Sequence, residues 1–256
     1  MSDLAAAIPA LRQALTPAAE ARAMARFARD PAINRQLDAF TRAVERAPDL
    51  RAALRDPRVL GVLLPAMGLP DAVGQAGLAQ RALAADPKDP NGLLARLSDP
   101  RWKSVAETLD LSRRGLEGLR DPALRQTLAD GLRRLAWQKE LNQAHPGIGD
   151  AIAFTQRAAR GAGNTYAVLG DPILRRVVTG ALGLPPELSV QSVEAQARAV
   201  EQRFDTSKLA NPREVSKMAE RYLLTAGAAG GGGGNASPLL ALFGGGGGFP
   251  AGGLLV

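Results

Sequence analysis

Apolar residues recur at helical spacing through most of the chain, most clearly between residues 169 and 224. Asp171-Pro172 begins a helix there, and Gly183 ends it. Ser189 or Ser192 begins a second helix, and Asn211-Pro212 begins a third, with Glu214 completing a capping box. The predicted inner faces are Leu174, Val177, Val178, Ala181 and Leu182, then Val193, Ala197, Val200 and Phe204, then Val215, Met218, Tyr222 and Leu223.

The dipeptide Asp-Pro recurs along the chain, at residues 30, 56, 86, 89, 99, 121 and 171. An aspartate carboxylate can accept from a free first-turn N–H, and proline has no N–H to lose at that position. The units from Asp56 and Asp171 both end in Gly-Leu-Pro. This pairing indicates either an old structural duplication or the repeated use of a good helix start. We expect the first unit to bury Val62 and Ala66, and the second unit to bury Val177 and Ala181. Pro65 should kink the first unit or end it early.

The rest of the sequence predicts further helices separated by proline and glycine. They are two short helices over residues 4–27 that part at Thr16-Pro17, then 34–46, 71–85 (with Val73, Leu78, Ala82 and Leu83 inward), 93–97, 121–144 and 148–160. The spacing of the units is not constant, which argues against a solenoid. The chain is therefore expected to be an all-α, multihelical, non-solenoid domain over residues 1–226, with residues 1–50 weakly anchored.

The composition changes after Ala226, where polyglycine runs surround a short apolar segment at residues 237–243. Polyglycine loses much entropy on ordering, so residues 227–256 are expected to form a flexible or disordered tail. The apolar segment is either a peptide that docks on a partner or low-complexity drift. Its candidate docking residues are Leu239, Leu240, Leu242 and Phe243.

Charge and composition restrict the classes of function. The net charge is +7, but only 5 of the 32 basic residues are lysines, and arginines stand beside acids along the whole chain. This pattern is typical of a GC-rich gene, and nucleic-acid binding is not expected. Cysteine is absent, so no disulfide or cysteine-ligated metal is expected. The N-terminus lacks a basic signal-peptide region and no apolar run would span a membrane, which predicts a cytoplasmic protein.

No catalytic motif is present, so we expect no enzyme, metal or cofactor site. The single histidine, His145, lies in a predicted helix end and is expected to meet terminal carbonyls. Nucleophile elbow, HExxH and Walker A patterns are missing. The acids Glu194, Glu201 and Asp205 are read as a solvated helix face, and Trp102 and Trp137 as packing residues.

Residues 56–111 and 169–224 carry a family resemblance. The text DPRVLGVLLPAMGLPD, then DPNGLLARLSDPRWKSVAETLDL, then LGDPILRRVVTGALGLPPEL resembles an alphaproteobacterial domain-of-unknown-function family found beside flagellar genes. The block from Gln191 to Tyr222 also fits, whereas the first 50 residues match poorly. The resemblance implies an all-helical protein connected with flagellar assembly or function, and it implies no catalytic residues.

The leading hypothesis is a non-enzymatic flagellum-associated protein that acts through protein–protein contacts. One alternative is a peptidoglycan-cutting accessory enzyme, which a deep cleft with converging carboxylates would favour. Another is an arginine-rich nucleic-acid binder, which arginines gathered on one face would favour.

Overall fold

The computed structural model describes the backbone of residues 2–230, and every regular element in that range is helical. The α-helices are α1 (Ser2–Ala14), α2 (Pro17–Phe27), α3 (Pro31–Arg46), α4 (Leu50–Arg55), α5 (Pro57–Ala66), α6 (Ala76–Ala84), α7 (Leu93–Arg96), α8 (Pro100–Leu109), α9 (Leu111–Arg120), α10 (Pro122–Ala144), α11 (Ile148–Arg157), α12 (Thr165–Gly170), α13 (Pro172–Ala181), α14 (Val193–Glu201) and α15 (Pro212–Gly230). Short 3-10 turns are η1 (Pro70–Ala72), η2 (Ala158–Gly161), η3 (Pro186–Val190) and η4 (Thr206–Ala210). The predicted all-α class is confirmed.

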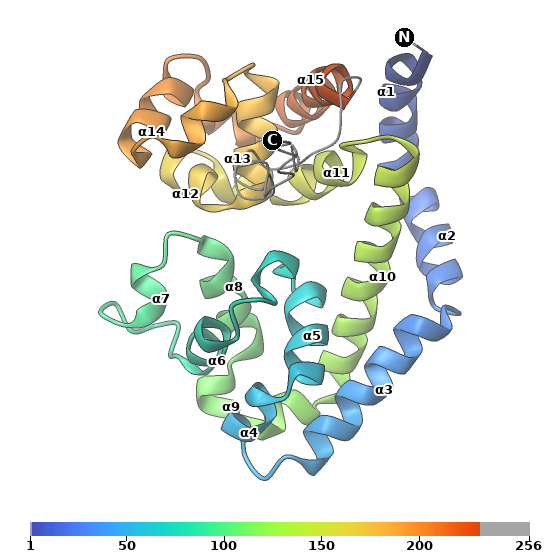
Figure 1. Cartoon of the computed structure of the whole chain (residues 1–256), viewed down its shortest axis with the longest axis vertical. Coiled ribbons are helices and arrows are strands. Elements are labelled where there is room, and N and C mark those ends of the chain that lie inside the picture. Colours follow the sequence, from blue (N-terminus) through green and yellow to red (C-terminus); the bar gives the residue numbers. More distant parts are fainter. Residues whose placement is uncertain (1, 231–256) are drawn as a thin grey trace, which may run out of the picture.

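The helices form two lobes joined by the long helix α10 (Figure 1). The lower lobe contains α3 to α9 and the first half of α10, and the upper lobe contains α1 and α11 to α15. Each lobe has its own hydrophobic cluster: Leu128 and Leu132 of α10 belong to the lower one, and Trp137 to the upper one. Phe27 of α2 packs against both clusters. One helix therefore supplies both cores and fixes one lobe against the other.

Five of the Asp-Pro dipeptides begin α-helices, as the sequence predicts. Asp30, Asp56, Asp99, Asp121 and Asp171 each cap a helix by accepting from the backbone N–H two residues on, at 2.7–2.9 Å. Asp86-Pro87 makes the same contact to Lys88 at 2.9 Å but leads into a turn. The motif thus fixes the local backbone, and the following residues decide whether a helix continues.

The two Gly-Leu-Pro units end in the same way. Helices α5 and α13 have ten residues each, and Gly68 and Gly183 follow with φ of +84° and +62°. Leu69 donates to the carbonyl of Leu64 at 2.8 Å, and Leu184 donates to Thr179 at 2.9 Å. Both ends are therefore Schellman-type turns that need a left-handed residue.

Burial within these units follows the prediction with one exception. Val62, Val177 and Ala181 are buried, but Ala66 is only partly buried. Pro65 does not end α5 early, since the helix continues to Ala66. A proline in the last turn interrupts little, because few helical residues follow it.

Three other expectations were wrong. Val73 is 43% exposed because the chain forms η1 and a turn there, so α6 begins only at Ala76. Val193 is 48% exposed because it is the first residue of α14, outside the buried stripe. The predicted capping box does not form, because Glu214 does not accept from the backbone N–H of Asn211. Glu214 pairs with Lys217 at 2.8 Å instead, and the N–H of Asn211 donates to the Lys208 carbonyl.

The N-terminal helices are better anchored than expected. Pro9 lies inside α1 and does not end it. Leu11 is 1% exposed in the upper cluster, and Phe40 is 2% exposed in the lower one. The predicted tail segment at residues 237–243 lies outside the described residues. Within the described range, no helix combines the length and apolarity needed to cross a membrane.

Candidate functional site: an arginine-lined cleft between the lobes

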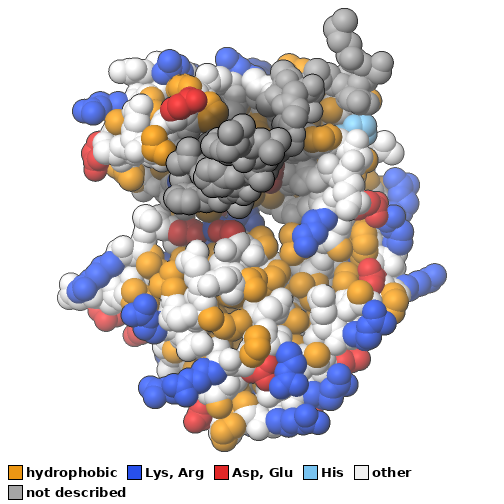
Figure 2. Space-filling model, viewed as in Figure 1, with side chains coloured by type: hydrophobic (Ala, Val, Ile, Leu, Met, Phe, Trp, Pro, Cys, Tyr) orange, Lys and Arg blue, Asp and Glu red, His pale blue; other side chains and the backbone are white. Residues whose placement is uncertain are grey.

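A cleft with a volume of about 420 Å³ lies between the two lobes. The end of α5, the turn into η1 and helix α8 line it from the lower lobe, whereas α11 and α13 line it from the upper lobe. Helix α10 contributes residues from Gly131 to Asn142. In Figure 2, acidic and basic side chains meet where the two lobes adjoin. The cleft therefore depends on the relative position of the lobes.

The first functional element is the tripeptide Asp99-Pro100-Arg101 at the start of α8. Asp99 accepts from the backbone N–H of Arg101 at 2.9 Å and from its guanidinium at 2.8–3.1 Å. The same tripeptide at Asp56 folds Arg58 back in the same way, at 2.7–3.2 Å. The tripeptide is thus a local device that caps a helix and holds the following arginine beside the cap.

Arg101 differs from Arg58 in burial and in its second partner. Its side chain is 5% exposed, and it forms a bidentate pair with Asp71 at 2.9 and 2.7 Å. Its Nη1 also donates to the Gly68 carbonyl at 3.0 Å. The hydrogen bonds from Arg101 hold the pKa of Asp71 below its ordinary value. Burial opposes the charge of Arg101, but its bonds to Asp71 and Asp99 outweigh this and raise its pKa. Arg101 is therefore fully satisfied.

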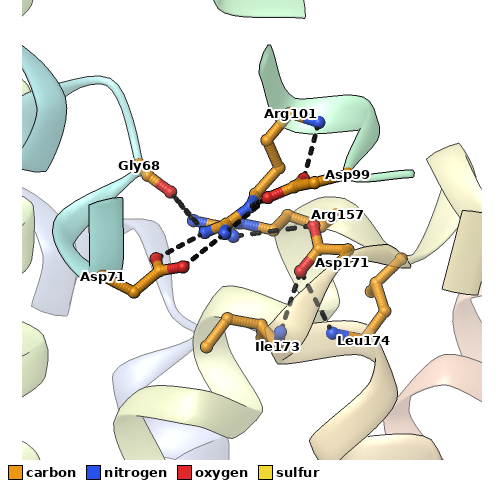
Figure 3. A network of polar contacts seen from close by, with 8 residues as sticks. All are labelled: Gly68, Asp71, Asp99, Arg101, Arg157, Asp171, Ile173 and Leu174. Atoms are coloured by element: carbon orange, nitrogen blue, oxygen red, sulfur yellow. Dashed lines mark hydrogen bonds and ion pairs between the residues drawn. The ribbon is translucent and has the colours of Figure 1, made fainter. Parts of the chain in front are cut away.

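Arg157, at the end of α11, lies beside Arg101 and is poorly satisfied (Figure 3). Its Nη2 donates to the Gly68 carbonyl at 3.4 Å, and its Nη1 is 3.6 Å from Asp171 Oδ2. Within the described residues, the buried Nη1 has no hydrogen-bond partner. Burial lowers the pKa of Arg157; Asp171 opposes the effect, while Arg101 and Arg160 add to it.

Backbone geometry keeps these groups close together. Asp171 is 2% exposed, and its Oδ1 accepts from Ile173 at 2.8 Å and from Leu174 at 3.3 Å. A Cβ on Gly170 would collide with the carbonyl oxygen of Ser98, so the two lobes touch through backbone at this point. Glycine there permits the close approach that brings Arg157 over Gly68.

A second polar chain lines the other part of the cleft. Asp150 accepts from Arg176 at 2.8 Å and from the Tyr222 hydroxyl at 3.2 Å. Burial is the main cause that raises the pKa of Tyr222, so this phenol remains protonated. Arg134 of α10 pairs with Glu20 at 3.0 Å. The tyrosine and both arginines are thereby held in fixed positions.

Charges in and around the cleft nearly balance. Six cationic side chains line it: Arg101, Arg134, Lys139, Arg157, Arg160 and Arg176. Four of these cations form ion pairs with carboxylates. The five carboxylates are Glu20, Asp71, Asp99, Asp150 and Asp171. Lys139 and Arg160 form no ion pair in the part of the chain that the structure describes. The excess is one positive charge.

The residues singled out from sequence do not converge here. His145 is half-buried at the end of α10, and its backbone N–H donates to Leu141. Glu194, Glu201 and Asp205 are exposed, as expected. Trp102 and Trp137 are buried in separate clusters, as packing residues. No group of three or more potential metal ligands occurs among the described residues.

The cleft residues were missed from sequence because they come from distant elements. Asp71, Arg101, Arg157 and Asp171 belong to four different segments, with no motif that joins them. The repeated Asp-Pro-Arg tripeptide was the available signal for Arg101. The docking candidates Leu239, Leu240, Leu242 and Phe243 lie outside the described residues.

Comparison with known proteins gives a family and a fold. A model of the family described as "Protein of unknown function (DUF1217)" matches residues 66–215. A search of curated proteins found no match. The crystal structure of protein AGR_C_984 from Agrobacterium tumefaciens is similar, with a TM-score of 0.70 and 20% identity over 87% of this chain and 94% of that chain. At this identity the likeness concerns the fold alone.

Proposed function

The chain belongs to the family of proteins of unknown function DUF1217, and from its cleft we propose that it is a non-enzymatic protein that binds another protein. The observation that carries this proposal is the pairing of the carboxylates in the cleft. A carboxyl group that acts as a general acid must keep its proton near neutral pH, which requires a raised pKa. Asp71 has a lowered pKa instead, and Asp150 is held by an arginine and a tyrosine.

This arrangement argues against the accessory-enzyme alternative. A pair of carboxylates that cleaves a sugar polymer needs one proton donor and one group free to act as base or nucleophile. Two carboxylates, Asp71 and Asp150, line the cleft itself, and both accept hydrogen bonds from arginine N–H groups. These contacts occupy oxygens that a base or nucleophile would need.

The charge balance argues against a nucleic-acid binder. Affinity for a polynucleotide comes mainly from several cations that neutralise successive phosphates. The cleft has an excess of only one positive charge, and basic and acidic side chains are mixed over the visible face in Figure 2. A protein segment with a mixture of polar and apolar groups suits this lining better, since the apolar residues Pro65, Met67, Leu135 and Ile173 line the cleft together with the charged residues.

We propose further that the setting is the flagellum, on the resemblance described above. The test is a deletion strain, which should swim less than its parent while growing at the same rate. The intact gene should restore swimming, whereas Gln156→Trp, which places a large ring in the cleft from an exposed position on α11, should not. Gln143→Trp is the matched control, because Gln143 is exposed on α10 outside the cleft. Normal swimming of the deletion strain would contradict the flagellar proposal.

The apolar segment of residues 237–243 remains our second proposed contact. Burying one such side chain contributes about 1.5–3 kcal/mol, and ordering one residue costs about 1–2 kcal/mol, so docking should be weak alone. Truncation after Ala226 should leave the melting temperature nearly unchanged but reduce partner binding. Leu240→Asp combined with Phe243→Asp should do the same. A doubly substituted protein that binds and supports swimming like the parent would show that the segment is not a docking peptide.

A further inference from the structure

We propose that Arg157 is the anchor of a carboxylate-binding subsite, and that its ligand is an acidic peptide segment that enters the cleft between the lobes. This inference rests on the proposed function, because it names the chemistry of the partner that the cleft would bind.

The first observation is the difference between two neighbouring arginines. Arg101 makes six side-chain hydrogen bonds, to Gly68, Asp71 and Asp99. Arg157 has the same five N–H donors, yet the described residues offer it one acceptor, the Gly68 carbonyl at 3.4 Å. That carbonyl is already bound more closely by Arg101, at 3.0 Å. Arg157 therefore lacks the acceptors that a cation at this depth requires.

The second observation is that the nearest carboxylate is committed elsewhere. Asp171 Oδ1 caps α13 through two backbone N–H groups, and its Oδ2 stays 3.6 Å from Arg157 Nη1. Asp71 gives both of its oxygens to Arg101. A carboxylate supplied from outside would fill the role that neither aspartate performs.

The third observation concerns access. The side chain of Arg157 is 18% exposed and lines the cleft, although its Nη1 is covered. Arg160, exposed on the next turn, also lines the cleft and adds positive charge close to Arg157. A carboxylate in the cleft would meet the exposed edge of Arg157 and would be attracted by both cations. A small rotation of the guanidinium, held by one long hydrogen bond, would complete a bidentate pair.

The charge of the cleft selects among anions. One excess positive charge suits a single carboxylate, whereas a dianionic phosphate would lie near Asp71, Asp150 and Asp171 without matching compensation. A carboxylate on a peptide also uses the apolar lining contributed by Met67 and Ile173. The structure thus favours an acidic peptide over a phosphate or a polynucleotide.

The test is fluorescence anisotropy of the full chain with a fluorescent, end-capped hexapeptide that carries one glutamate among alanine and leucine residues, at low ionic strength. Arg157→Gln should weaken binding by about tenfold or more, as expected for the loss of a charge-assisted pair. Arg157→Lys keeps the charge but not the planar fork of donors, so its affinity for the peptide should lie between those of the parent and Arg157→Gln. Arg175→Gln is the matched control: it removes the same charge from an exposed position outside the cleft and should leave binding unchanged.

Folding should survive these changes. Gly68 keeps its bond from Arg101, and Asp171 keeps its two backbone donors, so equal melting temperatures are expected. Equal loss with Arg157→Gln and Arg175→Gln would overturn the subsite, because binding would then follow net charge alone. Absence of binding of the single-glutamate peptide by the parent chain would overturn it as well. Tighter binding of a single-stranded oligonucleotide, or displacement of the peptide by inorganic phosphate, would show that the carboxylate assignment is wrong.

These outcomes are separable from a failure of the proposed function. If Gln156→Trp abolishes swimming while the single-glutamate peptide fails to bind, the cleft is used but the acidic ligand is wrong. If the single-glutamate peptide binds through Arg157 while the deletion strain swims normally, the subsite stands and the flagellar setting fails.

Discussion

Arg101→Met should destabilise the protein far more than Arg58→Met, although both arginines follow the same Asp-Pro dipeptide. Methionine retains most of the apolar stem and removes the guanidinium. Arg101 is 5% exposed, and its loss leaves Asp71 and Gly68 without their closest donor and Asp99 with only its backbone donor. Arg58 is 60% exposed, and among the described residues it pairs with Asp56 alone.

The magnitude follows from burial. Removing one member of a fully buried ion pair costs about 3–5 kcal/mol. Here Asp71 is 48% exposed and Asp99 is 19% exposed, so water can replace part of the lost contact. We therefore expect Arg101→Met to lower the free energy of unfolding by about 2–3 kcal/mol. Arg58→Met should cost at most about 1 kcal/mol, as for exposed pairs in general.

Urea denaturation followed by far-ultraviolet circular dichroism measures the difference between the two variants. The hydrogen bonds from Arg101 lower the pKa of Asp71 in the folded protein. Their contribution is therefore complete above the unfolded pKa of about 4, and it is lost as the pH falls through the lower folded value. The gap between parent and Arg101→Met should narrow between about pH 5 and pH 2. Unfolding free energies within about 0.5 kcal/mol for the two variants at neutral pH would refute the reasoning.

Two further predictions concern packing. Val177→Asp should unfold the upper lobe, because Val177 is 0% exposed and an unpaired buried charge costs several kcal/mol. The control Val190→Asp, at an 86% exposed position, should leave the circular dichroism spectrum and the melting temperature unchanged. Gly170→Ala should lower the melting temperature, because its Cβ would collide with the Ser98 carbonyl, whereas Gly61→Ala has open space in α5 and should be neutral or stabilising; the reverse order in differential scanning calorimetry would contradict the close approach of the lobes.

The helices were predictable where their signals are local. Asp-Pro starts and Gly-Leu-Pro ends involve hydrogen bonds between residues two to five positions apart, so they can be read from the text. The errors at Val73 and Val193 have a local cause as well, because α6 begins later than predicted and Val193, directly after the predicted cap Ser192, is the first residue of α14 and lies outside its buried stripe. A periodic stripe identifies a face only when the helix start is known.

The cleft was beyond sequence reasoning for a different reason. Arg157 reaches Gly68 across 89 positions, and Arg101 reaches Asp71 across 30. Such pairs depend on how the lobes pack against α10, and no spacing rule relates them. The sequence shows many arginines beside acidic residues. Arg101 has such a neighbour, but so do arginines that remain on the surface, so this pattern does not distinguish buried arginines from exposed ones.

The amino-acid sequence by itself determined the helical class, five of the helix starts and the two glycine-ended turns, because these depend on contacts within a few residues. It also determined that Asp-Pro-Arg folds an arginine back onto its cap, at both Arg58 and Arg101. Only the tertiary structure decided that the second of these is buried while the first stays in solvent. It also decided that Arg157 lies beside Arg101 with too few acceptors. These outcomes depend on which surfaces the two lobes bring together, and a local pattern is the same whichever surface covers it.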